Sequence, residues 1–258
     1  MVELKSPAER ERMREAGRVV AEVLHLLAAA VRPGLATLEL DRLAEREIRR
    51  RGARPVFKGY QVRPDQPGYP ASVCVSVNNE VVHGIPGPRR LREGDLVSLD
   101  LGAEVGGLMG DAAVSVFVGA PPDAEALRLW QVTQAALEAG IRAVRIGGHI
   151  GDIGAAIQQV VEGAGFSVVR EFVGHGIGRA LHEDPQVPNY GVPGRGPRIR
   201  AGMALAIEPM VSAGDWPVEV LEDGWTAVTR DGSLSCHFEH TVFVGEDGVE
   251  ILTALPNA

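Results

Sequence analysis

Residues 94–119 read GDLVSLDLGAEVGGLMGDAAVSVFVG and place an aspartate in each of two apolar runs. Asp100 lies within LVSLDL, and Asp111 directly precedes AAVSVFV. Short apolar runs separated by glycines are typical of neighbouring β-strands. A buried carboxylate is costly unless it is paired, neutralised or bound to a metal, so both aspartates need a partner.

The second half of the chain repeats this pattern. LREGDLVSLD at 91–100 corresponds to IRAGMALAIE at 199–208, and GDAAVSVFVG at 110–119 corresponds to FEHTVFVG at 238–245. A repeat of roughly 110 to 130 residues is too long for a solenoid unit and favours a duplicated half-domain. We therefore expect one domain over residues 1–258, with half-repeats at about 1–119 and 120–258.

Each half begins with apolar residues at the spacing of an α-helix. Ser6-Pro7-Ala8-Glu9 has the form of a capping box, and Thr37 is expected to cap a second helix that ends before Gly52. Pro121-Pro122-Asp123 opens the corresponding helix of the second half, and a fourth apolar stripe ends before Gly165. Two helices over a curved antiparallel sheet in each half predict an α+β fold with pseudo-twofold symmetry and helices on one face.

Composition limits the partners and the compartment. A net charge of −8 argues against DNA binding. The basic run Arg49, Arg50, Arg51 and Arg54 is typical of a helix C-terminus, and ribosome contact is the alternative. Two cysteines, no apolar leader and no long apolar stretch indicate a cytoplasmic protein that does not enter membranes. We expect it to be a monomer.

The repeat aligns four acids: Asp100 with Glu208, and Asp111 with Glu239. Their charges would repel one another, and two divalent cations would balance them. His175 in VGHGIG is the best further ligand, because its flanking glycines let the backbone approach a metal, and a histidine favours a transition metal. Paired metals that share a bridging water hydrolyse amide or phosphate bonds.

Two further histidines are candidates for function. His83-Gly84-Ile85 echoes His175-Gly176-Ile177, and His182 follows His175 by seven residues. A lone histidine is usually structural. The position of His83 and His182 beside the proposed ligand motif favours a catalytic role for both.

The sequence resembles the type I methionine aminopeptidases, which belong to the M24-like pita-bread metallopeptidases, over essentially its whole length. The matching motifs are GYPASVCVSVN, VVHGIP, DLVSLDLG, GDAAVSVFVG, GHGIGRALHEDPQV, GMALAIEPM, GWTAVTRDGSLS and FEHTVFV. The resemblance implies a pita-bread fold. It also implies metal-dependent removal of the N-terminal methionine from nascent proteins and peptides whose second residue is small.

Metal ligands follow from the resemblance residue by residue. Asp100 would chelate one ion, Asp111 and Glu239 would bridge two, and His175 and Glu208 would complete the second site. Iron, manganese or cobalt would occupy both positions. Glu208 would also move a proton on the bridging water.

Substrate contacts are implied in the same way. His182 would hydrogen-bond the scissile amide, and His83 would contact the substrate backbone and help to protonate the leaving amine. The methionine pocket would be lined by the side chains of Tyr69, Cys74, His83, Leu181 and Trp225.

Three features depart from the family pattern. Leu181 stands where phenylalanine is common, and residues 61–67 lengthen the join to the GYP motif. Cys236 and His237 precede Glu239 without an assigned role.

Two alternatives have the same predicted fold. X-Pro aminopeptidases and dipeptidases share the five ligands but usually carry an added N-terminal domain. A non-catalytic binding module would have lost ligands, whereas all five are present in this sequence. The 33 positions between His175 and Glu208 leave no room for the helical insertion of the type II enzymes.

Overall fold

The computed structural model of the chain describes residues 2–64 and 66–255. Its helices over those residues are α1 (Pro7–Ala30), α2 (Thr37–Arg50), α3 (Ala124–Ala143) and α4 (Ile150–Gly163). The capping box of α1 is confirmed, because Ser6 Oγ accepts from Glu9 N and Glu9 Oε2 accepts from Ser6 N. Asp123 caps α3 by accepting from Ala126 N at 2.8 Å.

The expectation that Thr37 caps the second helix is wrong. Ala36 is the capping position, and its main-chain N–H donates to Glu39 Oε1 at 3.0 Å. Thr37 is the first helical residue, and its hydroxyl bonds both the N–H and the carbonyl of Gly87. That hydroxyl therefore ties the helix start to a distant turn.

The strands form one large antiparallel sheet and two small ones. Over the described residues the large sheet has nine strands in the order β1-β4-β5-β14-β9-β7-β8, with β2 paired to β4 and β15 paired to β14. The small sheets have the orders β13-β10-β6 and β11-β12-β3. The strand bounds are β1 (Arg54–Pro55), β2 (Cys74–Val77), β3 (Glu80–Val82), β4 (Leu96–Val105), β5 (Leu108–Phe117), β6 (Ser167–Val168), β7 (Gly174–Gly176), β8 (Glu183–Val187), β9 (Ala204–Ile207), β10 (Met210–Ser212), β11 (Val218–Val220), β12 (Ala227–Thr229), β13 (Ser235–His237), β14 (Glu239–Gly245) and β15 (Gly248–Ile251).

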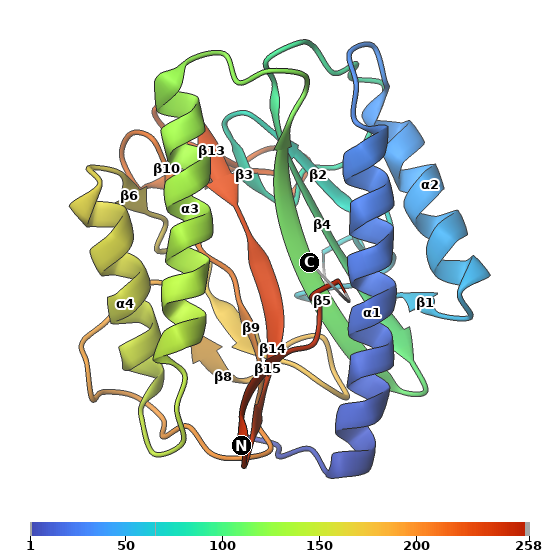
Figure 1. Ribbon diagram of the computed structural model, residues 1–258. Helices are drawn as coiled ribbons and strands as arrows, with labels where there is room; N and C mark the ends of the chain where they lie inside the picture. The colour runs from blue at the N-terminus through green and yellow to red at the C-terminus, as the bar shows by residue number, and fades with distance from the viewer. Residues whose placement is uncertain (1, 65, 256–258) are drawn as a thin grey trace.

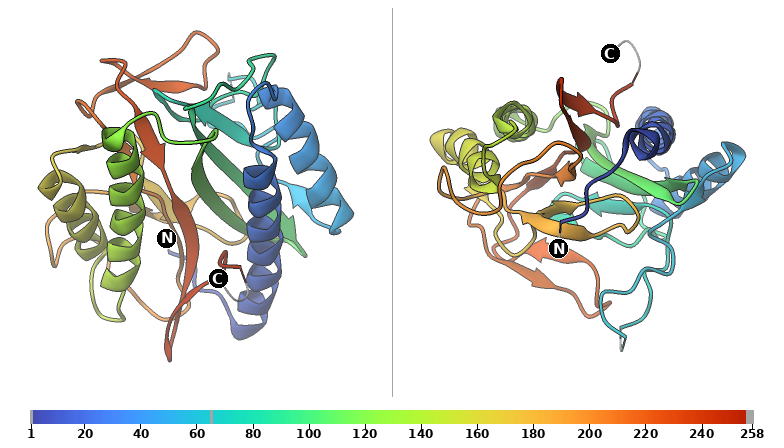
Figure 2. Two further views of the ribbon diagram at one scale, coloured as in Figure 1. Left: turned by 45° about the horizontal axis from the view of Figure 1, so that its top comes forward. Right: turned by 90° about the horizontal axis from the view of Figure 1, so that it is seen from below.

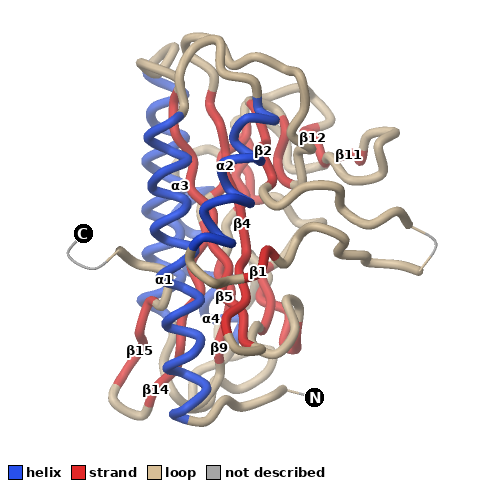
Figure 3. Tube along the Cα trace, turned by 90° about the vertical axis from the view of Figure 1, so that its right-hand side faces the viewer, coloured by secondary structure: helices blue, strands red, loops and turns tan. Residues whose placement is uncertain are grey.

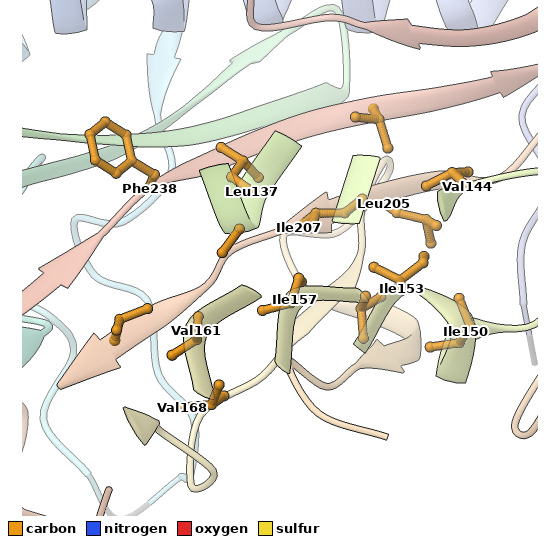
Figure 4. Packing of buried hydrophobic residues seen from close by; sticks show 14 of the residues in the cluster. Leu137, Val144, Ile150, Ile153, Ile157, Val161, Val168, Leu205, Ile207 and Phe238 are labelled. Atoms are coloured by element: carbon orange, nitrogen blue, oxygen red, sulfur yellow. The ribbon is translucent and has the colours of Figure 1, made fainter. Parts of the chain in front are cut away.

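All four described helices cover one face of the large sheet (Figures 1 and 2). Helices α1 and α2 pack on β2 and β4 through residues such as Leu27, Leu40 and Leu99. Helices α3 and α4 pack on β9 and β14, where Ile153 and Ile157 of α4 lie near Leu205 and Ile207 of β9 (Figure 4). The predicted α+β class, with helices on one face of an antiparallel sheet, is confirmed.

The two halves meet at the pairing of β5 with β14. Ala113 lies opposite Glu239, and Thr241 Oγ1 bonds both the N–H and the carbonyl of Asp111. Strand β4 flanks β5 on one side just as β9 flanks β14 on the other. The predicted half-repeats would give this arrangement, since residues 1–119 and 120–258 each contribute an inner and an outer strand in the same order.

The basic run at the end of α2 is engaged in ion pairs. Arg49 pairs with Glu45, Arg50 with Glu47, Arg51 with Glu22 and Glu47, and Arg54 with Glu104. These pairs favour the structural interpretation of the run, because each guanidinium already has a carboxylate partner. Within residues 2–64 and 66–255, every helix is too short or too polar to serve as a membrane span.

The described residues of the longer segment between Tyr60 and Gly68, 61–64 and 66–67, lie on the side of the sheet away from α1 (Figure 3). Gln66 Nε2 donates to Gly224 O at 2.8 Å, and Gln61 Nε2 donates to Gln66 O at 2.9 Å. The join is therefore tied to the loop that carries Trp225.

Gly17 provides a test of how closely α1 packs. A Cβ atom at this position would overlap the main-chain carbonyl of Leu252. Replacing glycine by alanine inside a helix normally raises the free energy of unfolding by about 1 kcal/mol. Overpacking lowers it by about 1 to 3 kcal/mol. We expect Gly17→Ala to lower the free energy of unfolding in urea.

Gly163 at the end of α4 is the matched control, since no described heavy atom lies within 4 Å of the place that an added methyl group would take. Gly163→Ala should be neutral or stabilising. A Gly17→Ala protein as stable as the parent would contradict the close packing of α1 on Leu252.

Candidate metal centre and substrate pocket

Strand register places three carboxylates on the same face of the large sheet. Asp100 of β4 and Glu239 of β14 both lie opposite Ala113 of β5. Directly opposed residues share a face, and residues two apart on one strand also share a face. Asp111, two positions before Ala113, therefore projects to the same side as Asp100 and Glu239.

The same rule adds the two remaining predicted ligands. Ala206 of β9 lies opposite both His175 of β7 and Thr241 of β14. Thr241 is two residues from Glu239, and Glu208 is two residues from Ala206. The five predicted ligands therefore converge on the face opposite the helices, although they come from five separate segments.

These side chains line one cavity of about 410 Å³. It contains every predicted ligand and substrate-contact residue: Tyr69, Cys74, His83, Asp100, Asp111, His175, Leu181, His182, Glu208, Trp225 and Glu239. Residues that the sequence did not indicate also line it: Phe57, Tyr60, Val62, Glu171, Phe172, Val173 and Gln186. The structure thus brings the whole predicted set together.

The carboxylates in this cavity are electrostatically unfavourable on their own. Burial, followed by the charges of Asp111 and Glu208, raises the pKa of Asp100 well above its usual value. Burial raises the pKa of Asp111 to about 7, and burial with repulsion from Asp111 raises the pKa of both Glu208 and Glu239. A cation among them would remove this penalty.

Unpaired atoms in the cluster fit a metal ion. Asp100 Oδ1, Asp111 Oδ1 and Glu239 Oε1 are buried and have no hydrogen-bond partner among the described residues. Donor atoms of Asp111, His175 and Glu239 all lie within 4.8 Å of one another. Carboxylate oxygens together with imidazole nitrogen are a donor set that suits first-row transition metals.

His175 is held in the tautomer that a metal ligand needs. Its Nδ1 lies 2.9 Å from Gly176 O, so Nδ1 carries the proton and Nε2 presents a lone pair. Burial lowers the pKa of His175 to about 3, which keeps the ring neutral.

The glycines beside His175 are required by the packing of the sheet. A Cβ on Gly174 would overlap the carbonyl of Ala206, and one on Gly176 would overlap the carbonyl of Asp184. Neighbouring strands therefore require glycine at both positions.

His182 stands at the cavity mouth on a loop with several anchors. Its Nδ1 lies 2.6 Å from Tyr60 Oη. Glu183 Oε1 accepts from the N–H groups of Arg179 and Ala180, and Glu183 Oε2 pairs with buried Lys5. When the Tyr60 hydroxyl donates to Nδ1, His182 carries its own proton on Nε2.

His83 follows β3 in the left-handed region, with φ 61°. The proposed symmetry between His83 and His175 is wrong. His175 lies opposite Ala206, which corresponds to Ser98 in the first half, and Ser98 pairs with Ser76. His83 reaches the cavity from the loop after β3, where its ring lies edge to face with Phe172 and Trp225.

One wall of the cavity is apolar. Tyr69, Cys74, Leu181 and Trp225 are all buried and belong to one hydrophobic cluster. Tyr69 Oη donates to Gly84 O and Trp225 Nε1 donates to Pro67 O, so their polar atoms are satisfied away from the cavity. Burial raises the pKa of the Cys74 thiol, which therefore stays neutral.

Two residues near the centre had no role assigned to them from the sequence. Tyr60 precedes the lengthened join, which hid its relation to His182. His237 was noted without a role, and its Nε2 lies 3.8 Å from Glu208 Oε2. The signal for His237 was its position two residues before Glu239.

Comparison with known proteins agrees with this geometry. A sequence profile of metallopeptidase family M24 matches residues 11–246. The methionine aminopeptidase of Clostridium perfringens is 51% identical, over 99% of this chain and 100% of that protein.

Solved structures give the same result. The methionine aminopeptidase of Thermotoga maritima matches with a TM-score of 0.94 and 49% identity, covering 98% of this chain and 99% of that chain. A prolidase from Pyrococcus furiosus has a TM-score of 0.77 at 18% identity, covering 98% of this chain and 66% of that chain, and shows similarity of fold alone. The expected pita-bread fold is confirmed, and the chain belongs to metallopeptidase family M24.

Proposed function

We propose that this chain is a metal-dependent methionine aminopeptidase, which removes the N-terminal methionine of nascent proteins and peptides when the second residue is small. The observation that carries the proposal is the meeting of five ligand side chains and an apolar wall in one cavity. The relatives named above support it, because they carry this activity in their names at about half identity.

The ligand assignment follows the predicted scheme. Asp100 would hold one ion, Asp111 and Glu239 would bridge two, and His175 with Glu208 would hold the second. Iron, manganese or cobalt fits this donor set. When bound, two such ions would supply an activated water and polarise the scissile carbonyl.

Side chains of the protein would transfer protons and orient the substrate. Glu208 would move a proton on the bridging water as a general acid and base. His182, oriented by Tyr60, would donate from Nε2 to the oxygen on which charge develops. His83, which also lines the cavity, would contact the substrate backbone and help to protonate the leaving amine.

The apolar wall selects the first side chain. Tyr69, Leu181 and Trp225 offer a dry surface, and the neutral thiol of Cys74 is a soft neighbour for a thioether. An unbranched methionine side chain fits such a pocket, whereas a charged one would be desolvated without a partner.

The bridging role of two carboxylates is tested by Asp111→Asn and Glu239→Gln. Each change removes one charge that offsets both cations, so both variants should bind less metal. Turnover should fall by at least ~10²-fold, because metal-ion stabilisation is worth several kcal/mol. Metal content by mass spectrometry and turnover of a Met-Ala peptide are the measurements.

Asp41→Asn is the matched control, because Asp41 is a buried carboxylate of α2 that binds Ser72 N outside the cavity. It should keep its metal and its activity. Normal turnover by Asp111→Asn or Glu239→Gln would exclude the bridged arrangement.

The role of His182 is tested by His182→Ala. Deleting one donor to a developing oxyanion costs on the order of 10² to 10³ in kcat, and the metal content should be unchanged. Tyr60→Phe should lower kcat in the same direction by about 5-fold, as expected for one neutral hydrogen bond. Loss of metal from His182→Ala would instead make His182 a ligand.

Substrate choice is tested with a tripeptide panel read by mass spectrometry. Met-Ala and Met-Gly peptides should be cleaved, and Met-Lys and Met-Leu peptides should be nearly untouched. Norleucine should replace methionine with modest loss, since an apolar pocket discriminates a methylene by only about 1 to 3 kcal/mol. Faster cleavage of Ala-Pro or Gly-Pro peptides than of Met-Ala-Ser would favour the X-Pro alternative.

A further inference from the structure

His237 is a buried histidine beside the proposed metal centre that the mechanism above does not use. It ends β13 and lies opposite Met210 of β10, which follows Glu208 by two residues. This pairing brings His237 Nε2 to 3.8 Å from Glu208 Oε2. Only 1% of the residue is exposed, and Nε2 has no hydrogen-bond partner among the described residues.

The backbone of His237 is held rigidly. Ser115 Oγ accepts from His237 N at 3.1 Å and donates to His237 O at 2.7 Å. Ser98 Oγ in turn lies 2.7 Å from Ser115 Oγ. Because β4, β5 and β13 all fix this point, the orientation of the imidazole toward Glu208 is built into the sheet.

Glu208 has two imidazoles beside it, and they differ in what they can offer. His175 Nε2 lies 3.5 Å from Glu208 Oε1, but its proton is committed at Nδ1 to Gly176 O. A bare ring nitrogen cannot donate to a carboxylate. His237 Nε2 faces Glu208 at 3.8 Å and has no hydrogen-bond partner among the described residues, so a proton on this nitrogen would point toward the carboxylate.

The main chain of Glu208 already has its own support, since Asn189 Nδ2 donates to Glu208 O at 3.0 Å. The carboxylate of Glu208 accepts no hydrogen bond from the described residues. A side-chain ligand without an outer partner can swing away from a metal, and outer partners commonly fix ligand orientation.

We infer that His237 is a positioning residue, whose Nε2–H holds the Glu208 carboxylate in the orientation that a metal ligand requires. The inference rests on the proposed metal-dependent function. His237 as a direct ligand is the competing arrangement, because donor atoms of Glu208, His237 and Glu239 lie within 4.8 Å of one another.

The test measures Mn²⁺ affinity of chelator-treated protein by calorimetry, without substrate. His237→Ala should weaken Mn²⁺ binding by ~10 to 100-fold, the usual effect of losing an outer-sphere partner. His237→Gln should restore most of the affinity, because its amide N–H can replace Nε2–H while glutamine is a poor ligand for this metal. His237→Leu, which fills the space without a donor, should behave like His237→Ala.

His240→Ala is the matched control. His240 is also a poorly exposed histidine next to the centre in sequence, but it bonds Thr253 and lines a separate cavity with α1 and α3. Its replacement should leave the Mn²⁺ affinity unchanged. Circular dichroism of each variant checks the fold, and His237→Leu carries the test if His237→Ala does not fold.

A double-mutant cycle with Glu208→Ala separates positioning from direct ligation. If His237 acts through Glu208, adding His237→Ala to Glu208→Ala should change the affinity by less than about twofold, because the coupled partner is already absent. Parental affinity in His237→Ala, or no rescue by His237→Gln, would overturn the inference. Since Mn²⁺ binding is measured without peptide, an error in the proposed substrate would leave this test intact.

Discussion

Repulsion among buried carboxylates is the constraint around which this structure is organised. Asp100, Asp111, Glu208 and Glu239 face one cavity. Burial raises the pKa of all four, and repulsion from neighbouring carboxylates raises it further for Asp100, Glu208 and Glu239. An enclosed group of four acids is unstable unless cations or protons compensate it. The fold therefore depends on strong packing elsewhere, which the helix-covered face of the sheet supplies.

Antiparallel strand pairing fixes the positions of the side chains in this cluster. Each ligand sits at a fixed register position on a strand whose opposite side packs under helices, so a slip of one residue would expose the core and bury the wrong side chains. Leu99 and Leu101 flank Asp100 and point into the core beneath α1 and α2. Side chains alternate between the two faces of each strand, so the apolar residues pack under the helices and the carboxylates project into the cavity.

Much of the fold and of the metal centre was predictable, because both repeat locally in the sequence. Asp100 and Glu208 end the same apolar pattern, and Asp111 and Glu239 begin the next, so the repeat alone identified four acids. Tyr60 and His237 were not predictable, since their contacts depend on how distant segments meet. His237 reaches Glu208 through the pairing of β10 with β13, and Tyr60 reaches His182 across 122 positions of sequence. The crowding of Gly174 and Gly176 by strand carbonyls was likewise not predictable, because it depends on the neighbouring strands.

Strands and loops contribute different residues to the site. Four of the five proposed ligands lie on strands of the large sheet, and Glu208 directly follows one. His83, His182, Tyr60 and Trp225 instead lie outside the strands, on segments held by a few side-chain contacts. Loops change more readily than paired strands, because their length and sequence are less constrained by packing. This division explains how the fold can be shared with a prolidase at 18% identity, because strand pairing preserves the sheet while the loop sequences are free to change.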